Sequence, residues 1–141
     1  MSADRGCFVD SNIWLYAFIR TSDQDKCDRA RHVVEGVRNI TVSMQVVNEV
    51  SVNLLKKVNV AEKEIRDIVS AFYRKYRVIP LDEAVLNDAS RLREEHSFSF
   101  WDSLIVSAAL ASGVPVLYTE DMQHGRLVGG TLRIVNPFLP N

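Results

Sequence analysis

The sequence predicts an α/β protein, a three-layer α/β/α domain with a central, mostly parallel sheet. Two observations predict this class. Short apolar segments rich in β-branched residues alternate along the chain with longer segments whose apolar residues recur at helical spacing. Strands separated by helices pair in parallel, because each helix returns the chain to the same end of the sheet. With 141 residues, the chain is predicted to form one domain over residues 1–141.

The predicted strands are short and lie at regular intervals along the chain. They cover residues 7–9, 40–43, 77–81, 114–118 and 133–135. The first, Cys7-Phe8-Val9, is apolar throughout, which is typical of a strand buried on both faces. Pro80 lacks a backbone N–H, so it should end the third strand or place it at an edge of the sheet.

The predicted helices fill the intervals between these strands. They cover residues 12–18, 22–38, 44–58, 61–76, 83–95 and 100–112. Ser22 and Asp25 have the spacing of a capping box and predict the start of the second helix. Asp82 and Ser99 are predicted caps of the last two helices, and Gly113 is a typical helix end.

Composition and charge narrow the class of function. Seventeen basic and eighteen acidic side chains give a net charge of -1, which argues against a purely electrostatic nucleic-acid binder. It leaves room for contact with phosphate through a metal ion.

Cys7 and Cys27 form no disulfide framework, so free thiols in a reducing compartment are expected. The longest weakly polar stretch, Leu104 to Tyr118, is too short to span a membrane, and a cytoplasmic protein is predicted.

Acidic residues follow two of the predicted strands. Asp10 follows the first strand, and Glu120 and Asp121 follow the strand at residues 114–118. The carboxyl ends of parallel strands lie at one edge of a sheet, where ligands collect. These acids are therefore expected to converge, although loops favour Asp in any case and chance placement is the alternative.

Two further acids lie on predicted helices. Glu49 falls on the flank of the apolar stripe formed by Val46, Val47 and Val50, so it either reaches into a cleft or is a solvated boundary residue. Asp102, in the first turn of a late helix, either joins the same site or serves the helix start as a capping and dipole residue.

Together, the four acids predict a metal site. Crowded carboxylates repel each other and lose stability unless a cation joins them. His32, His96 and His124 are scattered without zinc spacing. An all-oxygen site suits Mg²⁺ or Mn²⁺. Its chemistry is the attack of metal-activated water on a phosphodiester.

Four motifs, taken in order, resemble the PIN-domain family of metal-dependent ribonucleases, and in particular the VapC-type toxins of toxin–antitoxin pairs. These motifs are Phe8-Val9-Asp10-Ser11-Asn12, Val47-Asn48-Glu49-Val50, Phe100-Trp101-Asp102-Ser103 and Leu117-Tyr118-Thr119-Glu120-Asp121. They span nearly the whole chain. The resemblance implies a PIN-like fold with the acids clustered at the carboxyl edge of the sheet.

The resemblance also implies roles for individual residues. Asp10 and Asp102 would be the principal Mg²⁺ or Mn²⁺ ligands. Glu49 would ligate directly or through water and help polarise the attacking water, and Asp121 would act at a second metal position or through water. The supporting residues would be Asn12 and Thr119, which hold the acidic loops by hydrogen bonds, and Glu120 is the alternative to Asp121 as the fourth acid.

The implied partners are an RNA substrate, a cognate antitoxin protein whose C-terminal segment enters the acidic groove, and a second copy of the chain in a homodimer. The apolar helices between Val46 and Tyr76 are either a dimer face or core. RNA contact needs local basic residues, for which the candidates are Arg20, Lys56, Lys57 and Arg126.

Two alternative functions belong to other classes. A phosphatase of Rossmann-like fold needs a second carboxylate two residues after its nucleophile, and that position is Asn12. The other alternative is a PIN-like binding module without catalysis, whose acids only cap helices and fill loops. Tight binding of Mn²⁺ would exclude such a module.

Overall fold

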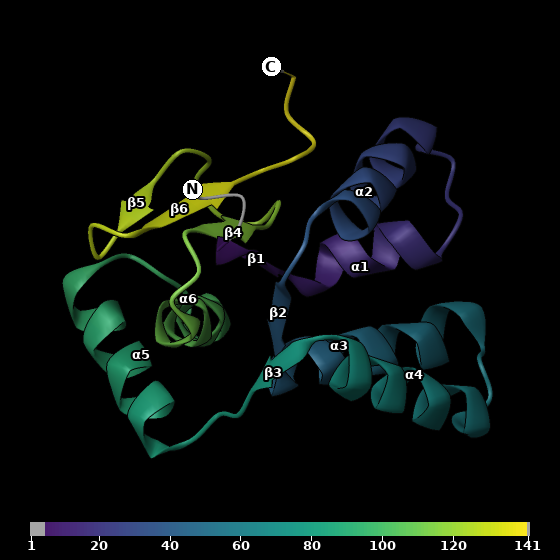
Figure 1. The fold of residues 1–141 in the computed structure, drawn as a ribbon, viewed down its shortest axis with the longest axis horizontal. Coiled ribbons are helices and arrows are strands. Elements are labelled where there is room, and N and C mark those ends of the chain that lie inside the picture. The colour runs from purple at the N-terminus through teal and green to yellow at the C-terminus, as the bar shows by residue number, and fades with distance from the viewer. Residues whose placement is uncertain (1–4, 141) are drawn as a thin grey trace.

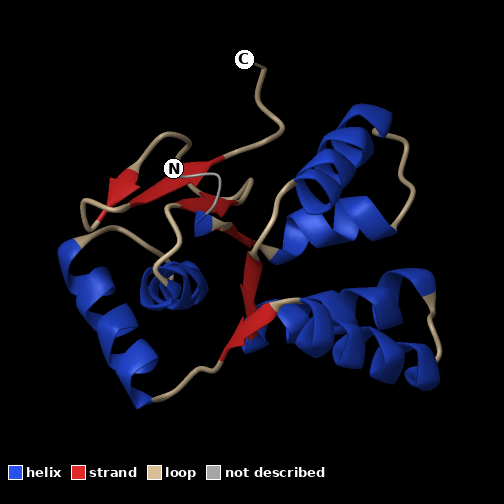
Figure 2. Cartoon of the chain, viewed as in Figure 1, coloured by secondary structure: helices blue, strands red, loops and turns tan. Residues whose placement is uncertain are grey.

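The computed structural model describes residues 5–140 and confirms the predicted three-layer α/β/α class (Figures 1 and 2). Within this range six strands form one sheet in the order β3-β2-β1-β4-β6-β5, and only the β5–β6 pair is antiparallel. The strands are β1 (Cys7–Val9), β2 (Ile40–Ser43), β3 (Arg77–Ile79), β4 (Val116–Tyr118), β5 (Leu127–Val128) and β6 (Leu132–Val135). The helices are α1 (Ser11–Phe18), α2 (Gln24–Gly36), α3 (Met44–Asn53), the π-helical segment η2 (Leu54–Val58), α4 (Glu62–Lys75), α5 (Glu83–Glu95) and α6 (Phe100–Ser112).

The handedness of the connections explains the layers. The chain crosses the sheet in one direction from β1 to β3 and then returns to β4 on the other side of β1. Connections between parallel strands are right-handed, so this reversal places α5 and α6 on the face opposite α1 to α4. Figure 1 shows this arrangement, with α5 and α6 on one side of the sheet and α1 to α4 on the other. No helix within residues 5–140 is long and apolar enough to cross a membrane.

The reversal of strand order lies between β1 and β4, which fixes where a ligand would bind. Phe8 and Val9 of β1 are fully buried, and they pair with Leu117 and Tyr118 of β4. In open α/β sheets, the crevice at the carboxyl ends of two such strands is the usual binding site. The residues that follow β1 and β4 therefore share one edge of the sheet.

Several predicted boundaries are confirmed by their caps. Asp82 and Ser99 accept hydrogen bonds from the backbone N–H groups of residues 85 and 102, as N-caps of α5 and α6. Gly113 ends α6 in the left-handed conformation at φ 79°. β3 lies at an edge of the sheet and ends just before Pro80.

The start of α2 is a correction. Asp23, not Ser22, is its N-cap and accepts a hydrogen bond from the Lys26 N–H. A carboxylate is the stronger acceptor, and the hydroxyl of Thr21 holds Asp23 in place through its N–H. The helix ends at Gly36, because Val37 is already extended. Similarly, α1 begins one residue earlier than predicted, since Asp10 is its cap.

Other boundaries differ in detail. The helix predicted over residues 44–58 is α-helical to Asn53, continues as the π-helical η2, and ends at left-handed Asn59. The strands predicted over 77–81 and 114–118 are shorter, since Pro80 and Pro115 cannot donate to the ladder. The last strand begins one residue early, and the two-residue β5 was not predicted because it is too short to show periodicity.

Candidate active site

Asp10 lies at the carboxyl end of β1 and forms the N-cap of α1. Only 4% of its surface is exposed. Its Oδ1 accepts a hydrogen bond from the Ser11 backbone N–H at 2.7 Å, and its Oδ2 accepts one from the Thr119 hydroxyl at 2.8 Å. The acid predicted from the first strand is thus buried and held at both carboxylate oxygens.

Thr119 connects the ends of β1 and β4. Its side chain is fully buried, and its Oγ1 also accepts a hydrogen bond from the Asp121 backbone N–H at 3.2 Å. Its own N–H donates to the carbonyl of Val135 on β6. One hydroxyl therefore fixes the Asp10 carboxylate relative to the loop that carries Asp121.

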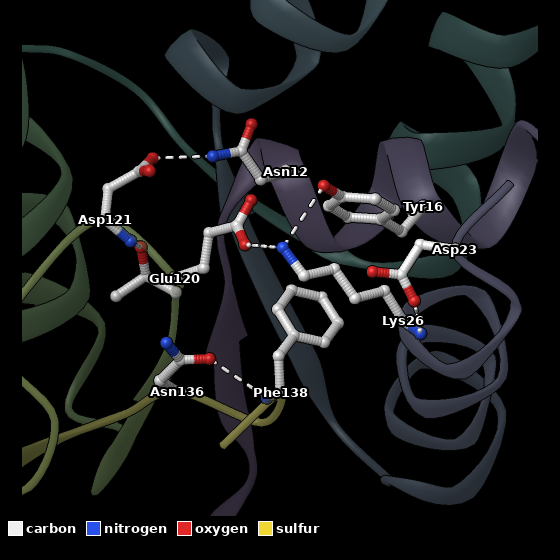
Figure 3. Close-up of polar contacts among 9 residues, drawn as sticks. Asn12, Tyr16, Asp23, Lys26, Glu120, Asp121, Asn136 and Phe138 are labelled. Carbon is white, nitrogen blue, oxygen red and sulfur yellow. Dashed lines mark hydrogen bonds and ion pairs between the residues drawn. The ribbon is translucent and has the colours of Figure 1, made fainter. Parts of the chain in front are cut away.

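The two adjacent acids after β4 point in different directions (Figure 3). Asp121 extends toward α1, where its Oδ2 accepts a hydrogen bond from the Asn12 amide at 2.6 Å. Glu120 extends toward α2 and forms an ion pair with Lys26 at 3.0 Å. The Lys26 ammonium also lies over the rings of Tyr16 and Phe138, at 5.2 and 5.3 Å from their centroids. This geometry favours Asp121 over Glu120 as the fourth acid of the cluster.

Glu49 and Asp102 reach the site from helices on opposite faces of the sheet. Glu49 lies on α3 and Asp102 in the first turn of α6, and both are half-buried. The cap of α6 is the Ser99 hydroxyl, which accepts from the Asp102 backbone N–H at 3.1 Å. A hydrogen bond with the Ser99 side chain also lowers the pKa of the Asp102 carboxyl, and the helix dipole favours its charge there, so Asp102 serves the start of α6 as well as facing the other acids.

The pKa values show that the four acids share one electrostatic environment. Burial raises the pKa of Asp10 to about 7, and the charges of Glu49 and Asp121 add to that rise. Burial and then Asp121 and Asp102 raise the pKa of Glu49. The pKa of Asp121 is raised by burial, Glu120 and Asp102, and that of Asp102 by burial. Each acid either feels or exerts repulsion within the set, which is the condition that a cation relieves.

The donor set fits a hard divalent cation. All four side chains offer carboxylate oxygens, and the amide of Asn12 and hydroxyls of Ser11 and Thr119 lie among them. Mg²⁺ and Mn²⁺ prefer such oxygen donors and complete their shells with water and phosphate. Across residues 5–140, no three His, Cys, Asp or Glu side chains are already arranged around one metal position.

Two residues of this region were not singled out from the sequence. Lys26 holds Glu120 away from the cluster. Gln45 of α3 donates to the Trp101 carbonyl at 3.4 Å and, as a hydrogen-bond donor, offsets part of the rise in the pKa of Glu49. Lys26 lies in a charged helix with no distinguishing signal. Gln45 had one signal, as a polar residue one turn before Glu49 on the same helix face.

The basic candidates lie in different surroundings. Lys57 lines a cleft of about 300 Å³ together with Asn12, Tyr16 and Glu120. The Arg126 guanidinium stacks 4.3 Å from the ring of Phe98. Arg20 and Lys56 are exposed.

The predicted free thiols are confirmed, because Cys7 and Cys27 are both buried and unbonded to each other.

The fold and the acidic cluster define a PIN-type α/β protein, and comparison with known proteins gives the family. The sequence model of the PIN domain matches residues 7–129, which is most of the chain. The chain therefore belongs to the PIN domain family, as its motifs predicted. A search of curated proteins found no match.

Solved structures of toxin–antitoxin proteins share this fold. One is a toxin–antitoxin complex from Klebsiella pneumoniae, with a TM-score of 0.69, 17% identity and coverage of 93% of this chain and 97% of that one. Another is VapC20 of Mycobacterium tuberculosis, described as a toxin that cleaves the sarcin–ricin loop, with a TM-score of 0.66, 15% identity and coverage of 82% and 91%. VapBC2 from Rickettsia felis, bound to a promoter DNA fragment, has a TM-score of 0.62, 18% identity and coverage of 92% and 98%.

Proposed function

We propose that this protein is a single-domain, metal-dependent endoribonuclease of the cytoplasm, and the toxin of a toxin–antitoxin pair. The observation that carries the proposal is the convergence of Asp10, Glu49, Asp102 and Asp121 from four separate segments of the chain. Their pKa values rise through burial and mutual repulsion, as expected of a site built for a cation. Membership of the PIN family and the fold shared with an RNA-cleaving toxin support the same function.

In this proposal Asp10 and Asp102 hold the metal, Glu49 ligates directly or through water, and Asp121 serves a second position. A bound Mg²⁺ or Mn²⁺ would lower the pKa of water and stabilise charge on the phosphodiester. Ser11 and Thr119 orient the Asp10 carboxylate, and Asn12 orients that of Asp121. Glu49, whose pKa is raised and whose side chain is half-buried, is placed to accept a proton from attacking water.

The test is cleavage of structured RNA by the purified protein. We expect cutting with Mg²⁺ or Mn²⁺, none with a chelator, and products with a 5′-phosphate, because water attacks and the 3′ oxygen leaves. Asp10→Asn and Asp102→Asn should each abolish cutting. Asp88→Asn is a matched control, because Asp88 is an exposed acid of α5 paired with Arg91. Full activity in both site variants would refute the metal assignment.

Metal affinity separates the enzyme from a PIN-like binding module. Calorimetry with Mn²⁺ should show binding to the wild-type protein that Asp10→Asn removes. Absence of both Mn²⁺ binding and RNA cleavage would favour the binding module instead.

We also propose an antitoxin partner, since the toxin structures of similar fold were solved in toxin–antitoxin complexes. An apolar cleft of about 240 Å³ lies between α1 and α4, lined by Trp14, Phe18 and Phe72 among others. It suits the apolar face of a partner helix. The second cleft, lined by Asn12, Tyr16 and Glu120, leads toward the acids. Inhibition of cleavage by the product of a neighbouring small gene would test this pairing.

A homodimer is the remaining proposed assembly. The segment from Val46 to Tyr76 carries exposed apolar side chains, including Val52, Val58 and Tyr73. Light scattering during gel filtration gives the mass in solution, and a mass of one chain at micromolar concentration would contradict the dimer.

A further inference from the structure

A pocket adjoins the acidic cluster on the side of α3 and α6. It has a volume of about 350 Å³ and is lined by Gln45, Asn48, Glu49, Leu81 and Trp101. Glu49 is the acid described above, and Trp101 immediately precedes Asp102. The pocket is therefore continuous with the proposed cleavage site, but four of its five lining residues have no part in holding a metal.

Trp101, the one aromatic residue among those that line the pocket, is part of an exposed aromatic surface. Trp101 is 64% exposed and Phe100 53% exposed, and their rings meet edge to face with centroids 5.2 Å apart. The guanidinium of Arg93 stacks on the Phe100 ring at 4.4 Å. Within residues 5–140, Arg93 forms no ion pair and donates instead to the Ser103 hydroxyl. A large indole this exposed, beside an arginine with no acidic partner, suits a planar ligand that carries negative charge.

Amide groups supply the polar side of the pocket. Gln45 is 7% exposed, and its Oε1 is buried without a hydrogen-bond partner among the described residues. Buried amide oxygens are normally paired, so this oxygen is an acceptor that a ligand N–H can satisfy once the Gln45 side chain turns toward the pocket. Asn48 also lines the pocket. It is exposed, and its side-chain amide offers both a donor and an acceptor.

We propose that this pocket binds an unpaired base of the RNA, next to the phosphodiester that is cut. A nucleobase is planar, stacks on aromatic side chains and carries N–H and carbonyl groups at its edge, which matches the indole and the two amides. Arg93 lies where it can meet the phosphate of a neighbouring nucleotide. Trp101 is the stacking residue, and Asn48 and Gln45 determine which base is preferred. The inference rests on the proposed ribonuclease function.

Binding can be measured without cleavage. Trp14 is only 1% exposed, so quenching of tryptophan fluorescence by a small ligand in chelator reports on Trp101. We expect short oligoadenylate, oligocytidylate or oligouridylate to quench the wild-type protein, and an abasic ribose-phosphate oligomer of equal length to do so far less. Trp101→Leu should weaken oligonucleotide binding, measured by anisotropy of a labelled RNA, by about 5- to 150-fold, the usual range for loss of one stacking contact.

Two further variants sharpen the test. Leu86→Ala is the control, because Leu86 is a 46% exposed apolar residue of α5 that does not line the pocket. It should leave RNA binding unchanged. Asn48→Ala should alter the preference among the three oligomers while Trp101→Leu weakens all of them, since stacking is indifferent to base identity and hydrogen bonding is not.

The outcomes distinguish this proposal from the proposed function. Wild-type cleavage with unchanged binding by Trp101→Leu overturns the base pocket and leaves the nuclease intact. Quenching by bases in a protein that never cuts RNA supports the pocket and refutes the nuclease. Equal quenching by the abasic oligomer also overturns the pocket. So does a Trp101→Leu variant that loses self-association but keeps RNA binding. Each result shows that Trp101 contacts something other than a base.

Discussion

The two halves of the acidic cluster are built differently. The sheet half consists of Asp10 and Asp121 at the ends of β1 and β4: Asp10 is buried and held by Ser11 and Thr119, and Asp121 is exposed and held by Asn12. The helix half consists of Glu49 on α3 and Asp102 on α6, and both of these side chains are half-buried. One half is anchored in the sheet, whereas the other depends on how two helices from opposite faces pack together.

The difference indicates which of the acids lower the stability of the folded protein. A buried carboxylate is held in place by the fold even when its charge is unfavourable, and the repulsion is stored in the folded state. The half-buried acids keep part of their hydration and are free to adjust to a ligand. We infer that the sheet half defines the position of a cation and the helix half closes upon it. Substitutions in the sheet half and in the helix half should therefore change the stability of the metal-free protein differently.

Asp10→Asn should give the largest effect. The pKa of Asp10 is about 7 in the folded protein, against 3.8 as its ordinary value. The folded state therefore binds more protons than the unfolded state between these values, and the stability of the metal-free wild type should fall as pH rises from about 4 to 7. The Asn Oδ1 can still accept from the Ser11 N–H, and its Nδ2 can donate to the Thr119 Oγ1 in place of the bond that this hydroxyl gave to Asp10. The charge is gone, so the variant should be more stable by up to about 4 kcal/mol at pH 7.

Urea denaturation in chelator at pH 4.5 and pH 7.5 measures this effect. The wild type should lose stability between the two pH values, and Asp10→Asn should lose much less. An identical decline in both proteins would show that the charge of Asp10 is not what strains the sheet half.

Thr119→Val should have the opposite sign. Valine matches the shape of threonine but removes the hydroxyl that donates to Asp10 and accepts from the Asp121 N–H. The buried Asp10 carboxylate and the partly buried Asp121 N–H then each lose a partner, which costs about 1–3 kcal/mol. Thr131→Val is the control, because Thr131 is an exposed threonine near β6. Equal unfolding free energies for the two variants in urea would contradict the bracing role of Thr119.

The sequence predicted the sheet half more completely than the helix half, for a physical reason. Asp10 and Asp121 follow apolar strands, and parallel strands bring their carboxyl ends together whatever the strand order. Glu49 and Asp102 meet only through the packing of α3 and α6 across the sheet edge, which helical periodicity does not specify. The Lys26–Glu120 pair joins residues far apart in the chain, and no local pattern announces such a contact. The short β5 was missed because two residues are too few to show a periodicity. The left-handed Gly129 and Gly130 mark only the turn that follows it.

Asp102→Asn should change the stability of the metal-free protein little, by about 0.5 kcal/mol or less. Loss of its interaction with the helix dipole is offset by relief of the repulsion that raises the pKa of Glu49 and Asp121. The same variant should abolish the rise in melting temperature that Mn²⁺ produces in the wild type. Glu83→Gln is the control, because Glu83 is a first-turn acid of α5 outside the cluster. A Mn²⁺-dependent rise that persists in Asp102→Asn would separate the helix half from the metal.

Lys26→Met should also change stability little, by about 0.5 kcal/mol, because the ion pair with Glu120 is partly exposed. Its effect on pH dependence should be clearer. Glu120 already raises the pKa of Asp121, and loss of the lysine leaves that negative charge unneutralised. The pKa of Asp121 should then rise further, so the acid limb of the cleavage rate against pH moves to higher pH. Lys26→Arg keeps the charge and should restore the wild-type limb. If the acid side of the pH–rate curve does not move in Lys26→Met, then Asp121 ionises independently of Glu120, and the charges of α2 do not affect the sheet half.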